Sequence, residues 1–125
     1  RLAGGEPLAL DFAWMPLALA EPLLSADFSH TALYDELARR CGVRVTGGSE
    51  TITPLVPTPG RRRLLGLPRG VAVFEIERLA TALGRPVEFR RSLVRGDRFS
   101  VVAQWSPASS YTLDTASRWG APDAA

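Results

Sequence analysis

The sequence predicts an α+β domain, in which antiparallel strands form a sheet and short helices lie beside it. Three runs rich in β-branched and aromatic residues follow one another in the second half of the chain, and Gly, Pro or Asp separates them. This order is typical of an antiparallel meander, whose strands pair at low entropic cost because they are close in sequence. Two other stretches carry the spacing and the capping residues of helices.

A chain of 125 residues has the length of one domain and can bury a core without disulfides or metals. The hydrophobic fraction of 46% and the charged fraction of 22% are those of a globular protein, and the net charge of +2 does not indicate nucleic-acid binding. The sequence has one cysteine, Cys41, and one histidine, His30, so we expect no disulfide within the chain and no bound metal or cofactor. The lack of a disulfide is consistent with a cytoplasmic location. No apolar run reaches the roughly 18 residues of a membrane span, and we expect no membrane association.

The first residues predict a hairpin followed by a strand. Residues 1–10 are similar to residues 78–89, with the same Arg-Leu-Ala start and a turn that is two residues longer in the second copy. We interpret the two segments as a duplicated hairpin, and we expect either that a strand preceding the first copy is missing from the chain or that its partner lies elsewhere. Residues 7–14 alternate bulky and small side chains, as a strand does. Asp11 lies on the face of small residues, where it meets either water or an open cleft.

A helix is predicted from Thr31 to Cys41, after a loop over residues 15–29 that contains two prolines. Apolar side chains recur at every fourth position, acidic residues come early, basic residues come late, and Gly42 follows as the C-cap. The expected N-cap is Ser29 or Thr31. The free N–H groups of the first turn could hold an anion, or the helix simply caps itself.

A strand with a glycine bulge is predicted over residues 43–56, and a second, short helix follows it. Thr58 is the expected N-cap of this helix, Pro59 its first residue, and Gly66 lies past its end. Three consecutive arginines on the helix point in different directions, so a solvated face is a better interpretation than a phosphate site.

The three strands of the predicted meander span residues 71–80, 87–94 and 99–105. Arg78 shares a strand face with large apolar residues, where an unpaired charge would be costly. Glu88 on the next strand offers a partner, and either the two form an ion pair or both bind a polar small molecule as a clamp. Residues 107–125 are rich in Ser, Ala and Pro, and we expect a loosely wrapped or partly disordered tail.

The sequence contains no nucleophile elbow, phosphate-binding loop, dinucleotide fingerprint or zinc spacing. A nucleophile and base would have to be Cys41 and His30, and Cys41 lies on the apolar stripe of its helix, where an inert thiol is expected. We therefore expect no catalytic residues and no enzyme activity.

Four motifs follow one another in the chain. They are Arg1 with Gly5-Glu6-Pro7-Leu8 and Asp11; Thr31-Ala32-Leu33-Tyr34-Asp35 with Leu37 and Gly42; Leu65-Gly66-Leu67-Pro68 with Gly70 and Glu77-Arg78; and Gly84-Arg85-Pro86-Val87-Glu88 with Arg95-Gly96-Asp97-Arg98-Phe99. In this order they resemble the UTRA effector-binding domain of GntR-type transcription regulators, in particular the HutC subfamily. Each motif alone is weak, but together they cover about residues 1–105.

The resemblance implies the chorismate-lyase-like fold, an antiparallel sheet with flanking helices, in a UTRA ligand-binding domain over residues 1–106 and a C-terminal tail over residues 107–125. It also implies a small-molecule effector and a homodimer. Regulators of this family contact DNA through a winged helix-turn-helix domain that precedes the effector domain. That domain is absent here, and we expect the chain to be N-terminally truncated.

Family ligand positions match Arg1, Asp11, Tyr34 and Glu88, and Arg78 joins them through the strand pattern. The family pattern has a hydroxyl residue at the position of Ala32 and an aromatic residue at the position of Val94. Thr31, next to Ala32, still offers a hydroxyl group. Both replacements remove hydrogen-bonding groups, so the resemblance implies an effector less polar than the phosphorylated amino sugars that many relatives bind. Our hypothesis is a ligand-sensing domain of a transcription regulator; the alternative is an enzyme on the same fold with chorismate-lyase-like activity.

Overall fold

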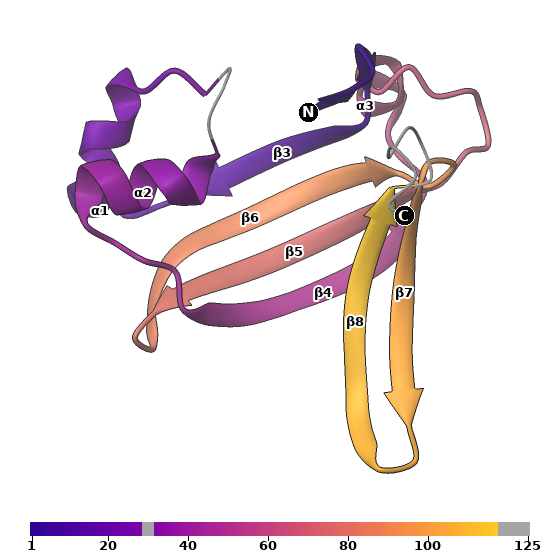
Figure 1. The fold of residues 1–125 in the computed structure, drawn as a ribbon. Coiled ribbons are helices and arrows are strands. Elements are labelled where there is room, and N and C mark those ends of the chain that lie inside the picture. The colour runs from indigo at the N-terminus through magenta and orange to yellow at the C-terminus, as the bar shows by residue number, and fades with distance from the viewer. Residues whose placement is uncertain (29–31, 118–125) are drawn as a thin grey trace. The chain divides into compact units, whose positions relative to one another are not determined.

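A computed structural model describes residues 1–28 and 32–117 (Figure 1). The chain divides into two compact units. The first unit contains residues 1–11, 53–75 and the described residues from 92 onward, and the second contains residues 12–52 and 76–91. Four strands in the order β3-β6-β5-β4 contribute residues to both units: β3 (Ala9–Trp14), β4 (Gly47–Leu55), β5 (Val73–Ala82) and β6 (Arg85–Arg95). The predicted α+β class, an antiparallel sheet with flanking helices, is confirmed.

The core of the first unit forms around the end of helix α3 (Pro59–Leu64). The N-cap Thr58 accepts a hydrogen bond from the backbone N–H of Arg61 at 3.4 Å, and Gly66 turns the chain with a φ of +63°. The predicted helix with its caps is therefore confirmed. Because the chain turns at Gly66, residues on both sides of it enter one buried cluster, whose members are Leu65, Leu67, Val73 and Leu93.

Two hairpins of the chain have tight turns of the same type. Strands β1 (Leu2–Ala3) and β2 (Glu6–Pro7) pair antiparallel around Gly4 and Gly5, whose φ angles are +57° and +81°. Leu83 and Gly84 connect β5 to β6 with φ angles of +50° and +78°. Positive φ at both central residues is the type I′ geometry that suits the twist of paired strands. The two hairpins are confirmed, but the longer second turn is wrong: the two extra residues extend the strands.

Strands β7 (Phe99–Ser106) and β8 (Ser109–Ser117) form a separate antiparallel pair, with Phe99 opposite Ser117 and an irregularity between Gln104 and Ser106. Two predictions are wrong here. The strand at 99–106 does not extend the meander, because β6 lies between β3 and β5 and has no free edge. Residues 109–117 form a strand and not a loose tail; their Thr and Tyr residues favour a strand despite the polar composition. The remainder of the predicted tail lies outside the described residues.

The helices of the second unit are α1 (Leu17–Ala20), the 3-10 helix η1 (Glu21–Ser25) and α2 (Leu33–Cys41). The loop predicted over residues 15–29 is therefore wrong for α1 and η1, because Pro16 caps the first and Pro22 occupies the first turn of the second, where proline is tolerated. None of the helices within the described ranges has the length and apolar character that crossing a bilayer demands.

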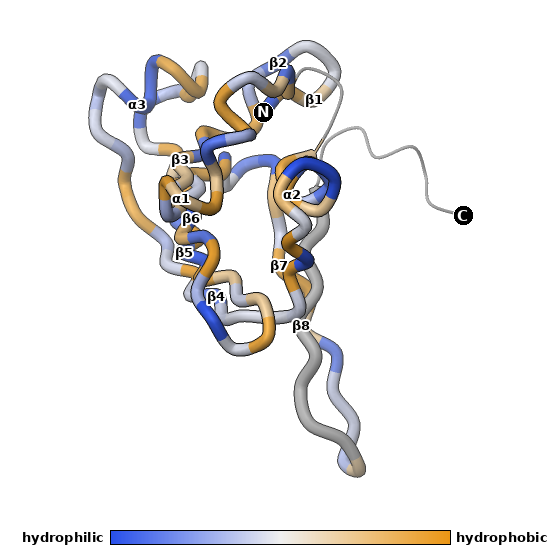
Figure 2. Tube along the Cα trace, turned by 90° about the vertical axis from the view of Figure 1, so that its left-hand side faces the viewer, coloured by the Kyte–Doolittle hydropathy of each residue, from blue (hydrophilic) through white to orange (hydrophobic). Residues whose placement is uncertain are grey.

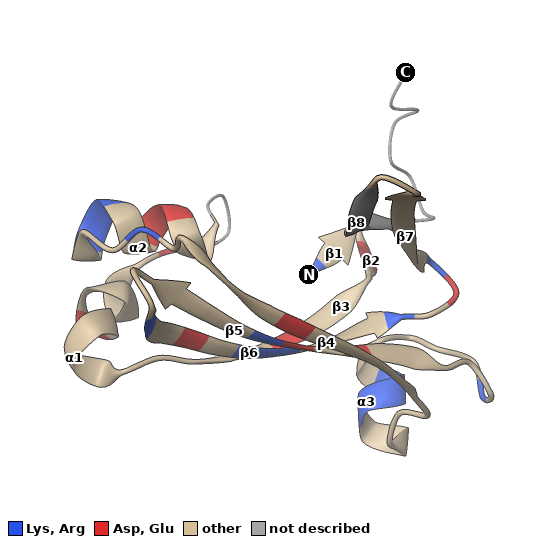
Figure 3. Cartoon of the chain, turned by 90° about the horizontal axis from the view of Figure 1, so that it is seen from below, with Lys and Arg blue, Asp and Glu red and all other residues tan. Residues whose placement is uncertain are grey.

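Helix α2 has one strongly hydrophilic side, and its acidic residues precede its basic ones (Figures 2 and 3). Gly42 ends the helix in the left-handed conformation with a φ of +67°, as predicted. The N-cap is Ala32, whose side chain makes no capping hydrogen bond, so the prediction of Ser29 or Thr31 is wrong. Buried Leu37 anchors the inner side, and the buried carboxylate of Glu36 pairs with Arg39 at 3.2 Å and Arg40 at 2.5 Å.

The turn between β6 and β7 is held by an ion pair and a close backbone contact. The guanidinium of buried Arg95 binds both oxygens of Asp97, at 3.0 and 2.9 Å. Between them, the N–H of Gly96 donates to the carbonyl oxygen of Ala72 at 3.0 Å. A Cβ at position 96 would lie 2.5 Å from that same oxygen, so the turn requires glycine.

We expect Gly96→Ala to lower the free energy of unfolding by about 1–3 kcal/mol, because the new methyl group forces the backbone apart at Ala72. Urea denaturation measures this loss. The matched control is Gly60→Ala in α3, where an added Cβ meets nothing within 4 Å and alanine favours the helix. Equal stability of the two variants would contradict the steric argument.

The Arg95–Asp97 pair also makes stability depend on pH. Hydrogen bonds from Arg95 hold the pKa of the Asp97 carboxyl below its ordinary value of 3.8, and this effect outweighs partial burial. A lowered folded-state pKa gives stability that is complete above the unfolded-state pKa and is lost as pH falls through the folded-state pKa. We expect the free energy of unfolding to decline below about pH 4, and Asp97→Asn to reduce that decline. Urea titrations from neutral pH to about pH 2 test this, and parallel acid profiles of the two proteins would contradict it.

Candidate functional site

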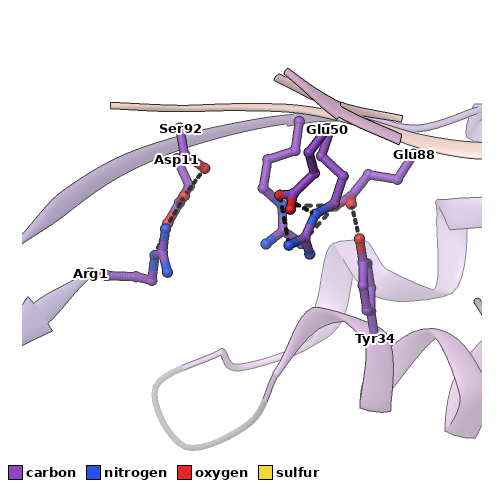
Figure 4. Close-up of polar contacts among 8 residues, drawn as sticks. Arg1, Asp11, Tyr34, Glu50, Glu88 and Ser92 are labelled. Carbon is purple, nitrogen blue, oxygen red and sulfur yellow. Dashed lines mark hydrogen bonds and ion pairs between the residues drawn. The ribbon is translucent and has the colours of Figure 1, made fainter. Parts of the chain in front are cut away.

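The first unit contains a polar cluster around Asp11. Arg1 donates from Nε to Oδ2 of Asp11 at 2.6 Å and from Nη2 to Oδ1 at 3.0 Å, and the Ser92 hydroxyl donates to Oδ1 (Figure 4). Asp11 lies within β3, two residues after the buried Ala9. The planar guanidinium matches the two carboxylate oxygens, which gives this pair directional specificity.

The second unit contains a larger cluster around Glu88 of β6, which is 2% exposed. Tyr34 of α2 donates its hydroxyl to Oε1 of Glu88 at 2.8 Å, and Arg90 donates from Nη2 to Oε2 at 2.9 Å (Figure 4). The guanidinium of Arg90 also lies over the Tyr34 ring, 5.3 Å from its centroid. A buried carboxylate is stable only with such partners, so Glu88 ties α2 to the strand beneath it.

Arg78 of β5 completes this second cluster. Its Nη2 lies 2.8 Å from Oε2 of Glu50 in β4, and Arg78 also acts on the protonation of Tyr34. Tyr34, which donates to Glu88, is therefore influenced by both ion pairs. Of the two alternatives for Arg78 and Glu88, the structure contradicts the direct ion pair, because each residue pairs with a different partner.

The cluster raises the pKa of both Tyr34 and Arg78. Burial raises the pKa of the Tyr34 hydroxyl, and the neighbouring Glu88 raises it further against the opposing effect of Arg78. Burial lowers the pKa of Arg78, but hydrogen bonds with Tyr34 and Glu50 outweigh it and the net shift is upward. At neutral pH the cluster therefore presents a phenol that keeps its proton and a guanidinium that stays charged. These groups offer hydrogen-bond donors and acceptors to a polar ligand.

The structure separates the predicted site residues into groups. Tyr34, Arg78 and Glu88 meet in the second unit, whereas Arg1 and Asp11 meet in the first. Val94 is buried in β6, next in sequence to Leu93 of the apolar cluster. Thr31 lies outside the described residues.

Three residues of the clusters were not among the predicted site residues: Glu50, Arg90 and Ser92. Arg90 and Ser92 lie two and four residues after Glu88, and this period-two spacing places them on the same strand face, a signal that could have found them. Glu50 gave no such signal, because its contact with Arg78 depends on β4 lying beside β5. Within residues 1–28 and 32–117, no three His, Cys, Asp or Glu side chains are grouped to hold a metal ion.

The model of the UTRA domain family matches residues 1–100. Among solved structures, the ligand-binding domain of a putative GntR-family transcriptional regulator from Bordetella bronchiseptica superposes with a TM-score of 0.67 at 24% identity, over 77% of this chain and 64% of that one. The C-terminal domain of the histidine utilization repressor from Pseudomonas syringae gives a TM-score of 0.74 at 18% identity, over 84% and 73% of the two chains.

The effector domain of PhnF from Mycobacterium smegmatis is 28% identical, with a TM-score of 0.68 over 75% of this chain and 58% of that one. The chain thus spans less than two thirds of the Bordetella and Mycobacterium domains that it resembles. The likeness to the Bordetella and Pseudomonas domains shows the same α+β fold. Since the family model covers most of its residues, the chain belongs to the UTRA domain family.

Proposed function

We propose that the chain senses a small-molecule effector for a bacterial transcription regulator of the GntR family, HutC subfamily, and acts by binding and not by catalysis. The observation that carries the proposal is the buried carboxylate of Glu88 with its partners Tyr34 and Arg90. An apolar cluster of the same shape would be as stable or more stable than such an ion pair, so stability alone does not explain its presence. The ligand-binding and effector domains named among the similar structures support the same function.

The second-unit cluster favours a ligand that carries both a hydrogen-bond donor and an anionic or strongly accepting group. Arg78 and Arg90 can each bind an acceptor bidentately, whereas Glu50 and Glu88 accept from hydroxyl or amino groups. The ligand would replace one partner in the existing ion pairs, so its donor and acceptor groups have to point in the same directions as the groups that it replaces. Ala32 and Val94 supply no hydrogen bonds from their side chains, which favours a ligand with an apolar part. Arg1, Asp11 and Thr31 are further proposed contacts, from their match to family positions.

The response to a ligand would pass through α2. Tyr34 connects this helix to β6 through Glu88, and Arg78 of β5 acts on the same hydroxyl. A ligand that binds the carboxylate of Glu88 or Glu50 would therefore change the contacts that hold the helix. A ligand shifts the regulator only by its difference in affinity for the two arrangements. In this proposal the chain works in the cytoplasm as a homodimer, and a separate winged helix-turn-helix domain contacts the DNA.

A thermal-shift screen tests the proposal, with phosphorylated amino sugars, histidine-pathway intermediates and fatty acids as probes. A ligand at about 100 times its Kd stabilises the folded chain by about 2.7 kcal/mol, which is several degrees in Tm for a domain of this size. We expect Glu88→Ala to abolish the shift, because Tyr34 and Arg90 lose the carboxylate that orients them. Glu21→Ala, an exposed carboxylate in η1, is the matched control.

Glu88→Gln keeps the shape of the side chain, and isothermal titration at room temperature measures binding by this variant without relying on its stability. Retained affinity in both Glu88 variants would contradict the assignment of the site. Release of pyruvate from chorismate would contradict the proposal of binding without catalysis.

A further inference from the structure

The first unit contains a pocket whose described walls include no residue of the two polar clusters. The walls come from Pro54 near the end of β4, from residues 71–74 at the start of β5, and from Gly96 and Asp97 in the turn after β6. Strands β4 and β5 are neighbours in the sheet, which brings Pro54 and residues 71–74 to the same place (Figure 1). All of these residues belong to one compact unit.

The turn at Gly96 shapes the pocket. The N–H of Gly96 donates to the carbonyl oxygen of Ala72 at 3.0 Å, which holds the turn against the start of β5. Gly96 has no side chain and that of Ala72 is small, so space remains between the two segments. Pro54 and Ala72 are exposed, and the pocket therefore opens to solvent.

The size of the pocket limits what it can hold. Its volume is about 260 Å³. An engineered cavity of about 150 Å³ admits benzene, whereas sites for drug-sized ligands begin at about 300 Å³. The pocket thus has room for a single ring or a short chain with one polar group.

The walls are mostly apolar and contain one aromatic ring. Residues 71–74 and Pro54 supply aliphatic and aromatic groups. The ring of Phe74 meets that of Phe99 edge to face, with centroids 5.6 Å apart and an angle of 61° between the planes. Among the lining residues, all of which the structure describes, Asp97 alone carries a charge.

The carboxylate of Asp97 is more accessible than the guanidinium that it binds. The Asp97 side chain is 35% exposed, whereas that of Arg95 is 7% exposed and lies behind the lining residues. Arg95 makes one hydrogen bond to each Asp97 oxygen, and a carboxylate can accept about four, so acceptor sites remain. The same hydrogen bonds hold the pKa of Asp97 below its ordinary value, so the group is ionised at neutral pH.

The charge of the walls selects among ligands of similar size. An anion in the pocket would meet the Asp97 carboxylate without a cation in the walls, and a neutral ligand would gain only apolar contact. A cation gains a charge-assisted hydrogen bond to Asp97, and the π face of Phe74 offers a further attraction. A cation with an apolar body therefore matches the pocket best.

We propose that this pocket is a second ligand site and that it binds a small organic cation, an ammonium group on a single ring or a short apolar chain. The ammonium group donates to the remaining acceptor sites of Asp97, and the apolar body packs against Ala72 and Phe74. This site goes beyond the proposed effector site, with which it shares no residue.

A titration with three probes tests the selection by charge. Phenethylammonium, phenethyl alcohol and hydrocinnamate each join a phenyl ring to a two-carbon chain, and their end groups are cationic, neutral and anionic. Backbone amide signals in NMR spectra give the dissociation constants, including weak ones. We expect phenethylammonium to bind at least about tenfold more tightly than the alcohol, and hydrocinnamate to bind most weakly. Equal affinities, a different order, or no binding by any probe would overturn the proposal.

The same spectra locate the probe. Amide signals of residues 71–74 and of Gly96 and Asp97 should move on addition of phenethylammonium and approach saturation. Signals of Tyr34 and Glu88 should stay in place. Changes confined to Tyr34 and Glu88 would place the cation in the polar cluster of the second unit. Changes spread over exposed carboxylates without saturation would show charge attraction without a site, and either result would contradict the assignment.

Two variants test the roles of single residues. Asp97→Asn keeps an oxygen that can accept from Arg95, and it should weaken phenethylammonium by at least about tenfold while the alcohol binds as before. Glu6→Gln is the matched control, because Glu6 is an exposed carboxylate of the same unit that does not line the pocket. Ala72→Leu, at an exposed position, fills the space and should abolish binding of both probes. Circular dichroism verifies that the variants fold.

The variants also have results that would overturn the proposal. A charge preference that survives in Asp97→Asn would do so, as would full affinity in Ala72→Leu. The outcome is separate from the effector screen, since no residue is shared. Binding of phenethylammonium in the pocket of a chain that responds to none of the effector probes would contradict the proposed function alone. An effector response without binding in the pocket would contradict the second site alone.

Discussion

The polar cluster of the second unit depends on the buried carboxylate of Glu88. Transfer of a charge from water to a protein interior is costly unless hydrogen bonds and an opposite charge compensate for it. Tyr34 and Arg90 provide that compensation, and Tyr34 extends the network to Arg78 and thus to Glu50. The position of α2 over the sheet is therefore set by a directional polar contact as well as by the apolar packing of Leu37.

Because the charged side chains are paired with one another, a ligand that binds at the proposed site has to exchange partners with them. The free energy of binding is then the difference between the interactions that the ligand makes and the ion pairs that it displaces, which favours moderate affinity. Discrimination between ligands can still be strong, since a ligand that lacks the right acceptor leaves a guanidinium or a carboxylate buried without a partner. This property suits a sensor, whose ligand has to leave when its concentration falls.

Local sequence signals predicted the elements that local physics determines. The caps of α3, the left-handed Gly42 after α2 and the positions of the two hairpins all depend on residues within a few positions of one another. Two of the errors have non-local causes. The place of β7 depended on β3 occupying the edge of β6, and the partner of Arg78 depended on β4 lying next to β5. Neither fact can be inferred from the spacing of residues along one strand.

The turn at Leu83 and Gly84 has a consequence for how this domain can change in evolution. Leu83 holds a φ of +50°, which is unfavourable for a side chain of its kind, and the pairing of β5 with β6 sustains it. A two-residue turn also sets the alignment of the two strands, and a slip by one position would send every side chain of β6 to the opposite side of the sheet. Glu88 would then point away from α2 and Phe89 toward it, so one inserted residue would exchange the polar and the aromatic sides of the sheet. Lineages of this domain should therefore tolerate substitutions at the hairpin tip far more readily than changes in its length.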